Sequence, residues 1–431
     1  MTSQSTTAQY FASIRSSAKA LQAFFEAFPK GGDIHHHALG ALLPEAIWAK
    51  GECFWANAEG QLSTIAQPGF LPLYSYDKSE MLANWSVTGA APEQHAQQFF
   101  DFFGKIAPIF QGQEGYWLGQ IAQQAAAENI LYVETLIEAP AARQKLWSWT
   151  DDWEYNQPDF EGWSQSLINY GVGDLIQEVL AEIATWKAEY QALAGPKAQL
   201  GLQWYAVRTY PLPMVFAQLY LAFQLAQESD WVLGVNLVGP EHAELSQAEF
   251  EGQMQAIRYL KQLFPAVSLA LHAGELRSDI LAGRPYQNPI EQAIQIGAQR
   301  IGHGVGLALE EHSATCLEMM KERAIPLELL LSSNAFILGL SPDQHPFSTY
   351  LAAEVPIVLA SDDPALLATS LSQEYCLLAQ NSQLGYEDFK QLSFNSIRYS
   401  FLPQREKENL EQELKKAFLS FESRKINPIN Q

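Results

Sequence analysis

Histidine and acidic residues occur in this sequence at the ends of short apolar runs, where they could hold a metal ion. The first group is the segment DIHHH at 33–37. If this segment is a strand, alternation puts His35 and His37 on one face and His36 on the other. Neutral imidazole is the commonest protein ligand for zinc, and a catalytic zinc has about three protein ligands and one open position. The segment therefore predicts part of a metal site, although a hydrogen-bonded polar pair would explain the same residues.

Two further segments could complete such a site. LHAGE at 271–275 places His272 at the end of an apolar run and Glu275 three residues later, with Gly274 allowing a tight turn. A carboxylate in this position can act on water or substrate bound to the metal. RIGHG at 300–304 carries His303 between two glycines, which permit close approach of a substrate.

The last of these segments is ASDDP at 360–364, which contributes Asp362 and Asp363. Taken alone, this segment is also typical of an Asx turn followed by the start of a helix, with Pro364 in the first helical turn. Four ambiguous segments at equivalent places are less well explained by chance, and together they indicate a metal hydrolase. A serine or cysteine nucleophile is disfavoured, because no G-x-S-x-G segment occurs and the cysteines lie away from these motifs. Three histidines and one aspartate favour zinc, with iron, manganese and cobalt as alternatives.

The elements that must position these residues are short strands, each followed by a helical pattern. His272, His303, Asn334 and Asp362 are 28 to 31 residues apart, which accommodates one strand, one helix and two loops. This rhythm predicts an α/β fold, a closed (β/α)₈ TIM barrel with its site at the carboxyl ends of the strands. An open doubly wound sheet is disfavoured, because its Gly-rich nucleotide-binding turn is absent. The predicted strands are 32–37, 129–137, 202–208, 231–239, 267–275, 300–304, 326–334 and 355–363.

Three helical additions to the barrel are expected. Residues 1–30 form an N-terminal extension, 50–128 a largely helical insertion after the first strand, and the C-terminal segment two helices separated near Pro403. No repeat or Pro/Gly-rich linker marks a boundary, so residues 1–431 are predicted to form one domain.

Composition restricts the partners of the protein. The chain has 431 residues, 48% of them hydrophobic, and a formal net charge of −22, which repels nucleic acid. The three cysteines are dispersed, which fits a reducing compartment. No apolar run approaches the ~20 residues needed to cross a bilayer, and the N-terminus has no signal-peptide pattern. We expect a cytoplasmic protein without membrane contact; its oligomeric state is open, with a homodimer as one option.

The motifs HxH, LHAGE, RIGHG, SSN and SDDP, in this order, resemble those of the adenosine deaminase family. The resemblance spans most of the chain, and the first motif with the long insertion looks most like the growth-factor-related branch and its bacterial relatives. It implies a zinc-dependent (β/α)₈ enzyme with one zinc ion per chain. The implied reaction converts a purine nucleoside, adenosine or 2′-deoxyadenosine, to inosine or 2′-deoxyinosine with release of ammonia.

The resemblance also implies a role for each residue of the site. Glu275 would protonate the purine ring, while His303 would orient the zinc-bound hydroxide and stabilise the developing oxyanion. Asp363 would share a hydrogen bond with the imidazole side of the purine, and the backbone amide of Gly239 would contact the purine. The implied zinc ligands are His35, His37, His272 and Asp362.

Three positions depart from the family pattern. Leu39 stands where the cytosolic enzymes have an acid that holds the ribose 5′-hydroxyl, Leu330-Leu331 replaces Cys-Pro, and Asn236 replaces an aspartate. A buried hydroxyl without an acceptor at Leu39 would cost about 1–3 kcal/mol. Either another loop reaches this hydroxyl or the enzyme tolerates its absence, and from the sequence we expect tolerance.

Other functions compatible with the sequence are an amidohydrolase acting on a different aminopurine and a catalytically silent binding protein; the intact ligand set argues against the second. The stretch from Trp147 to Tyr155 follows the second strand and should lie on the catalytic face, either as a lid or as a solvated loop with aromatic anchors. The histidines expected to be structural or at the surface are His36, His95, His242, His312 and His345.

Overall fold

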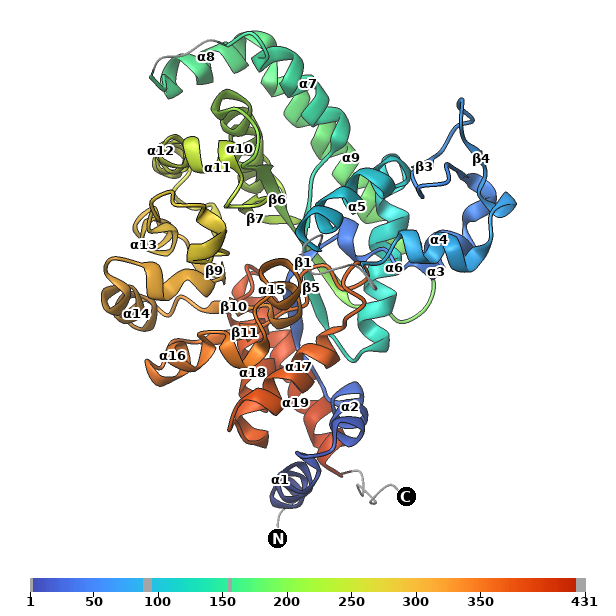
Figure 1. Cartoon of the computed structure of the whole chain (residues 1–431), viewed down its shortest axis with the longest axis vertical. Coiled ribbons are helices and arrows are strands. Elements are labelled where there is room, and N and C mark those ends of the chain that lie inside the picture. Colours follow the sequence, from blue (N-terminus) through green and yellow to red (C-terminus); the bar gives the residue numbers. More distant parts are fainter. Residues whose placement is uncertain (1–2, 88–94, 154–156, 424–431) are drawn as a thin grey trace.

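Eight parallel strands form the centre of the protein (Figure 1). The computed structural model describes residues 3–87, 95–153 and 157–423. Neighbouring strands pair in the order β1-β5-β6-β7-β8-β9-β10-β11, and each barrel strand lies within or close to a run predicted from the sequence. The bounds are β1 Gly32–His37, β5 Tyr132–Ile137, β6 Gln199–Val207, β7 Val232–Val238, β8 Ser268–Ala273, β9 Arg300–His303, β10 Leu327–Leu329 and β11 Ile357–Leu359.

Hydrogen bonds between the first strand and the residues after the last strand close the barrel. The N–H of His37 donates to the carbonyl of Asp362 at 2.8 Å, and the N–H of Asp362 donates to the carbonyl of His35 at 3.0 Å. The predicted (β/α)₈ barrel is therefore confirmed. The residues whose backbone groups close the barrel, His35, His37 and Asp362, are also predicted metal ligands.

Helices cover the outside of the barrel and return the chain from one strand to the next. The strands are short and largely buried on both faces, as expected of a parallel sheet covered by helices. Proline in the first turn starts several of these helices. The helices after β5 are α7 Pro140–Thr150, α8 Phe160–Tyr170, α9 Val172–Ala192, α10 Leu212–Glu228, α11 Glu244–Ala248, α12 Phe250–Leu263, α13 Pro289–Gln295, α14 Ser313–Glu322, α15 Leu331–Leu338, α16 Phe347–Ala352 and α17 Leu371–Asn381.

The strand predicted at 326–334 is wrong in its second half. Strand β10 ends at Leu329, and α15 begins two residues later, so Asn334 lies on a helix and not at a strand end. The carboxylate of Glu374, from α17, accepts hydrogen bonds from the N–H groups of Leu331 at 2.9 Å and Ser332 at 3.1 Å. This distant residue satisfies the free donors at the start of α15, which the local apolar pattern does not reveal.

The predicted additions are present, with one correction. Helices from the two ends of the chain pack together through aromatic rings, such as those of Phe25 and Phe389 (Figure 1). The insertion also contains a small antiparallel sheet, β3-β2-β4, that the prediction of a largely helical segment missed. The terminal elements are α1 Ser3–Ile14, α2 Ala18–Ala27, α18 Tyr386–Arg398 and α19 Gln404–Ser423; the insertion comprises α3 Pro44–Ala49, β2 Trp55–Ala56, β3 Leu62–Ser63, β4 Leu71–Pro72, α4 Lys78–Asn84, α5 His95–Phe110 and α6 Glu114–Ala127.

Within the described ranges, none of the helices combines the length and the apolar character that a bilayer span requires.

Candidate active site

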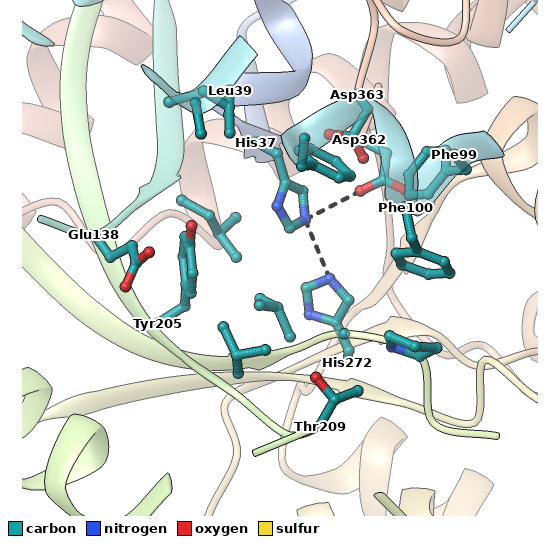
Figure 2. Close-up of a pocket in the computed structure, with 18 of the residues that line it drawn as sticks. His37, Leu39, Phe99, Phe100, Glu138, Tyr205, Thr209, His272, Asp362 and Asp363 are labelled. Atoms are coloured by element: carbon teal, nitrogen blue, oxygen red, sulfur yellow. Dashed lines mark hydrogen bonds and ion pairs between the residues drawn. The ribbon is translucent and has the colours of Figure 1, made fainter. Parts of the chain in front are cut away.

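The four predicted metal ligands converge at the carboxyl end of the barrel. His35 and His37 come from β1, His272 from β8, and Asp362 follows β11. The Nε2 atom of His272 lies 3.2 Å from Nε2 of His35 and 3.2 Å from Nε2 of His37. Oδ1 of Asp362 lies 3.5 Å from Nε2 of His35 and 3.3 Å from Nε2 of His37. Figure 2 shows His37 in contact with both His272 and Asp362.

These distances fit a tetrahedral metal ion better than a hydrogen-bonded cluster. Ligands about 2.0–2.1 Å from a tetrahedral zinc ion stand about 3.3 Å apart, close to the separations found here. Contacts among these residues leave Oδ1 of Asp362 buried without a hydrogen bond in the described structure. A divalent cation satisfies all four atoms at once, so the residues present fit zinc.

A buried charged network fixes the orientation of His35. Its Nδ1 lies 2.5 Å from Oε2 of Glu328, a residue of β10 whose side chain is fully buried. Arg300 pairs with Glu328 at 2.7 Å and also with Glu134. Burial opposes ionisation of Glu328, but the charges of Arg300 and His35 lower its pKa. The carboxylate therefore accepts a hydrogen bond from Nδ1–H of His35 and leaves Nε2 available for a metal ion.

Asn236 orients the ring of His272, as Glu328 orients that of His35. Oδ1 of Asn236, on β7, accepts a hydrogen bond from Nδ1 of His272 at 2.9 Å. Position 236 departs from the family pattern, yet its amide oxygen provides the required acceptor. Sequence reasoning assigned no such role to Asn236 or to Glu328; an acidic or amide residue within an apolar strand was the available signal.

Glu275 lies beside the metal ligands in a turn supported by a second ion pair. The carboxylate of Glu241 accepts hydrogen bonds from the N–H of Gly274 at 3.2 Å and of Glu275 at 3.3 Å. Arg208 lies 3.3 Å from Glu241 and also donates to the carbonyl of His272. Burial raises the pKa of Glu275 well above its ordinary value, and the charge of Asp362 raises it further. The protonated form of Glu275 is therefore favoured, which suits a general acid.

His303 presents one ring nitrogen to the same space. Nδ2 of Asn334 lies 2.9 Å from Nδ1 of His303, and Oε1 of Glu275 lies 3.6 Å from the same atom. Burial lowers the pKa of His303 well below its ordinary value, so the ring is neutral. Because both neighbours can donate to Nδ1, the ring proton resides on Nε2. His303 and Asp362 both have a positive φ, of 66° and 62°, a strained conformation for such residues that is common at functional sites.

Asp363 is the third polar side chain aimed into this space. Its Oδ1 is buried without a hydrogen bond in the described structure, and burial together with the adjacent charge of Asp362 raises its pKa well above the ordinary value. Gly40 leaves the room for it: a Cβ atom on Gly40 would lie 1.7 Å from Oδ1 of Asp363.

The converging residues line a cavity of about 650 Å³. Gly239, with a φ of 101°, lies on its wall, where the sequence placed it. Sequence reasoning missed the aromatic side of the cavity, which helix α5 of the insertion supplies through Phe99, Phe100 and Phe103. It also missed four polar residues of the wall. Glu138 directly follows β5, Arg143 lies on α7, Tyr205 lies on β6, and Tyr210 follows β6.

Two other predictions have mixed outcomes. Among the remaining histidines, His242 borders the cavity, a position that the sequence did not indicate. His36 points away from the site to Thr135, as expected, and the side chain of His95 lies outside the described residues.

The stretch from 147 to 155 begins as a helix and not as a loop, because residues 147–150 belong to α7. Its described rings act as anchors: Trp147 packs against Tyr210, and Trp149 stacks on Tyr170. Residues 154 and 155 lie outside the described part of the chain.

Comparison with known proteins adds to this geometry. Residues 220–417 match the family profile "Adenosine deaminase". Bovine N6-methyl-AMP deaminase is 33% identical over 188 residues, which cover 42% of this chain and 50% of that protein. The chain thus aligns with only about half the length of this relative. An adenosine deaminase from Clostridium botulinum is 24% identical over 352 residues, which cover 80% of this chain and 90% of that protein.

A solved structure extends the likeness to nearly the whole fold. N6-methyl-AMP deaminase from Arabidopsis thaliana superposes with a TM-score of 0.59 at 18% identity, covering 93% of this chain and 99% of that one. The barrel and the polar cluster at its strand ends define a (β/α)₈ protein with a candidate metal site. Residues 220–417 resemble the adenosine deaminase family in sequence, and the fold as a whole resembles that of the solved deaminase.

Proposed function

We propose that this protein is a zinc-dependent deaminase that converts a purine nucleoside, adenosine or 2′-deoxyadenosine, to the corresponding inosine and ammonia. The observation that carries the proposal is the convergence of four candidate metal-ligand atoms with the buried Glu275 at one end of a cavity of about 650 Å³. The match of residues 220–417 to the adenosine deaminase profile supports the same reaction.

Each polar group of the cavity then has a task. A zinc ion held by His35, His37, His272 and Asp362 would lower the pKa of water to about 7 and so supply hydroxide at neutral pH. Glu275 donates its proton to the purine ring nitrogen next to C6 while a new C–O bond forms at C6. Nε2 of His303 donates a hydrogen bond to the attacking oxygen. The proton of the new C6 hydroxyl passes to the amino group, the C6–N bond breaks, and ammonia leaves as the C6 carbonyl of the inosine product forms.

The non-reacting part of the purine is held by the remaining polar groups of the wall. The side chain of Asp363 shares a hydrogen bond with the imidazole side of the purine, and its raised pKa allows it to act as the donor. Gly239, with no side chain, lets the backbone approach the purine closely.

Ammonia release from a panel of purine compounds tests the proposal. The panel contains adenosine, 2′-deoxyadenosine, adenine, AMP and N6-methyl-AMP, assayed with the purified protein. Adenosine or 2′-deoxyadenosine should give the highest kcat/KM. Release from adenine or a nucleotide alone would replace the proposed substrate by another aminopurine, while release from none would overturn the proposed reaction.

One zinc ion per chain is expected to copurify with the protein, because the imidazoles of His35, His37 and His272 and the carboxylate of Asp362 converge as a ligand set. Elemental analysis of protein purified without added metal measures this ratio. Removal of the metal by a chelator should abolish ammonia release, and stoichiometric zinc should restore it. Full activity at a metal content far below one per chain would contradict the assignment.

A further inference from the structure

A buried acid lies on the cavity wall where the sequence predicted no acceptor. Glu138 directly follows β5, Leu39 follows β1, and Tyr205 is on β6. Since β5 lies between β1 and β6 in the sheet, the three side chains form one continuous section of the wall. Glu138 is only 8% exposed. Figure 2 shows Glu138 and Tyr205 on the side of the cavity away from Phe99 and Phe100.

The Glu138 carboxylate has one engaged and one available oxygen. Oε1 accepts a hydrogen bond from Arg143, on α7, in an ion pair. Within the described residues, Oε2 receives no hydrogen bond. Burial raises the pKa of Glu138 to about 7, and the charge of Arg143 acts in the opposite direction. The ion pair with Arg143 fixes the Glu138 carboxylate, so that its Oε2 can accept a hydrogen bond from a ligand in the cavity.

The orientation of the substrate, which rests on the proposed function, brings its sugar to this section. With the ring nitrogen N1 at Glu275, which follows β8, the atom N9 that carries the sugar lies across the purine from N1. In the barrel order, β8 and β1 are on opposite sides. The sugar therefore points toward the wall formed by Leu39 and Glu138.

The charge of the cavity argues against a phosphate at this end. Its described wall includes the carboxyl groups of Glu138, Glu275, Asp362 and Asp363, and Arg143 as its one arginine or lysine. Glu138 already neutralises Arg143. A nucleoside 5′-phosphate would bring a charge of about −1.5 to −2 next to these acids without a free cation to receive it.

We propose that Glu138, oriented by Arg143, accepts a hydrogen bond from a sugar hydroxyl and makes the enzyme specific for nucleosides over nucleoside 5′-phosphates and free bases. Glu138 thus provides the acceptor that is absent at Leu39. This assignment replaces the expectation that a missing hydroxyl is tolerated, because an analogue without it leaves Oε2 of the buried Glu138 carboxylate without a partner.

The test compares Glu138→Gln with the wild type on adenosine, its 5′-, 3′- and 2′-deoxy analogues, adenine and AMP. For the wild type, removal of one of the three hydroxyls should lower kcat/KM by about 10- to 100-fold, the effect of losing a hydrogen bond to a charged group. The variant should lose a similar factor on adenosine and become insensitive to that hydroxyl. Its ratio of AMP to adenosine activity should rise, because Arg143 is released from its partner.

Controls separate this proposal from the function on which it rests. Glu178→Gln makes the same change on the exposed face of α9, where the residue pairs with Lys145, and should leave all ratios unchanged. Zinc content and the thermal transition show whether Glu138→Gln is folded. If wild-type protein deaminates adenosine but loses less than about threefold with every deoxy analogue, the role of Glu138 is excluded and the reaction stands; no release from any purine excludes the reaction itself.

Discussion

Replacing Glu275 by glutamine is expected to lower kcat by a factor of about 10² to 10⁴ while the zinc content stays at that of the wild type. Glutamine preserves the shape of the side chain but has no proton to donate, and general acid–base catalysis typically contributes this factor. The backbone of residue 275 stays in place, because Glu241 holds its N–H and that of Gly274. Steady-state rates at equal zinc content, measured on adenosine, test the expectation.

A matched substitution shows whether the loss belongs to the site. Glu318, on the exposed side of α14, allows the same change far from the cavity, and Glu318→Gln should retain wild-type rates. A Glu275→Gln enzyme within about tenfold of the wild type would remove Glu275 from the role of proton donor. Loss of zinc from this variant would instead assign Glu275 to holding the metal.

The barrel and the catalytic cluster could be predicted because their signals are local. Each strand is a short apolar run, and each chemical residue directly follows such a run, so parallel topology alone brings His272 and Asp362 to the same end of the barrel. Alternation along β1 separates His36, bonded to Thr135, from its two neighbours. No tertiary information was required for these residues.

The groups that support the cluster could not be predicted, because they act over long distances in the sequence. Glu328 and His35 are 293 residues apart, and Glu374 caps a helix 43 residues before it. Neither pairing leaves a pattern in its own segment. Glu138 stands next to a strand end, as the catalytic residues do, but no partner motif marked it, and Arg143 became its partner only through the turn between β5 and α7.

The structure gives Gly302 a role that differs from the one expected from the sequence. Glycines beside His303 suggested close approach of a substrate. In the structure, Gly302 pairs with His272 on β8 and with Glu328 on β10, and its missing side chain leaves space for the ring of His35. The glycine therefore permits the packing of a metal ligand against the strand that supports it.

Gly302→Ala is accordingly expected to deprive the protein of most of its metal. A Cβ atom at this position would lie 2.7 Å from Cε1 and 3.1 Å from Nδ1 of His35. The ring cannot retreat, since it is fully buried and Nδ1 is held by Glu328 at 2.5 Å. Displacing it breaks that hydrogen bond or moves Nε2 from the metal site. Loss of such a supporting contact typically costs 10- to 100-fold in metal affinity or activity, and displacement of the ligand itself costs more.

The measurement is zinc per chain after dialysis, together with ammonia release before and after zinc is added. We expect activity of a few per cent of the wild type or less without added zinc, and partial recovery with excess zinc. Gly173→Ala is the matched control: Gly173 lies within α9, and a Cβ atom there would meet nothing within 4 Å. Because Gly173 is the second residue of the helix, the change should leave both zinc content and rates at those of the wild type. A Gly302→Ala protein that keeps one zinc ion and wild-type rates would show that His35 has room to move, and the tight coupling of Gly302, His35 and Glu328 would have to be abandoned.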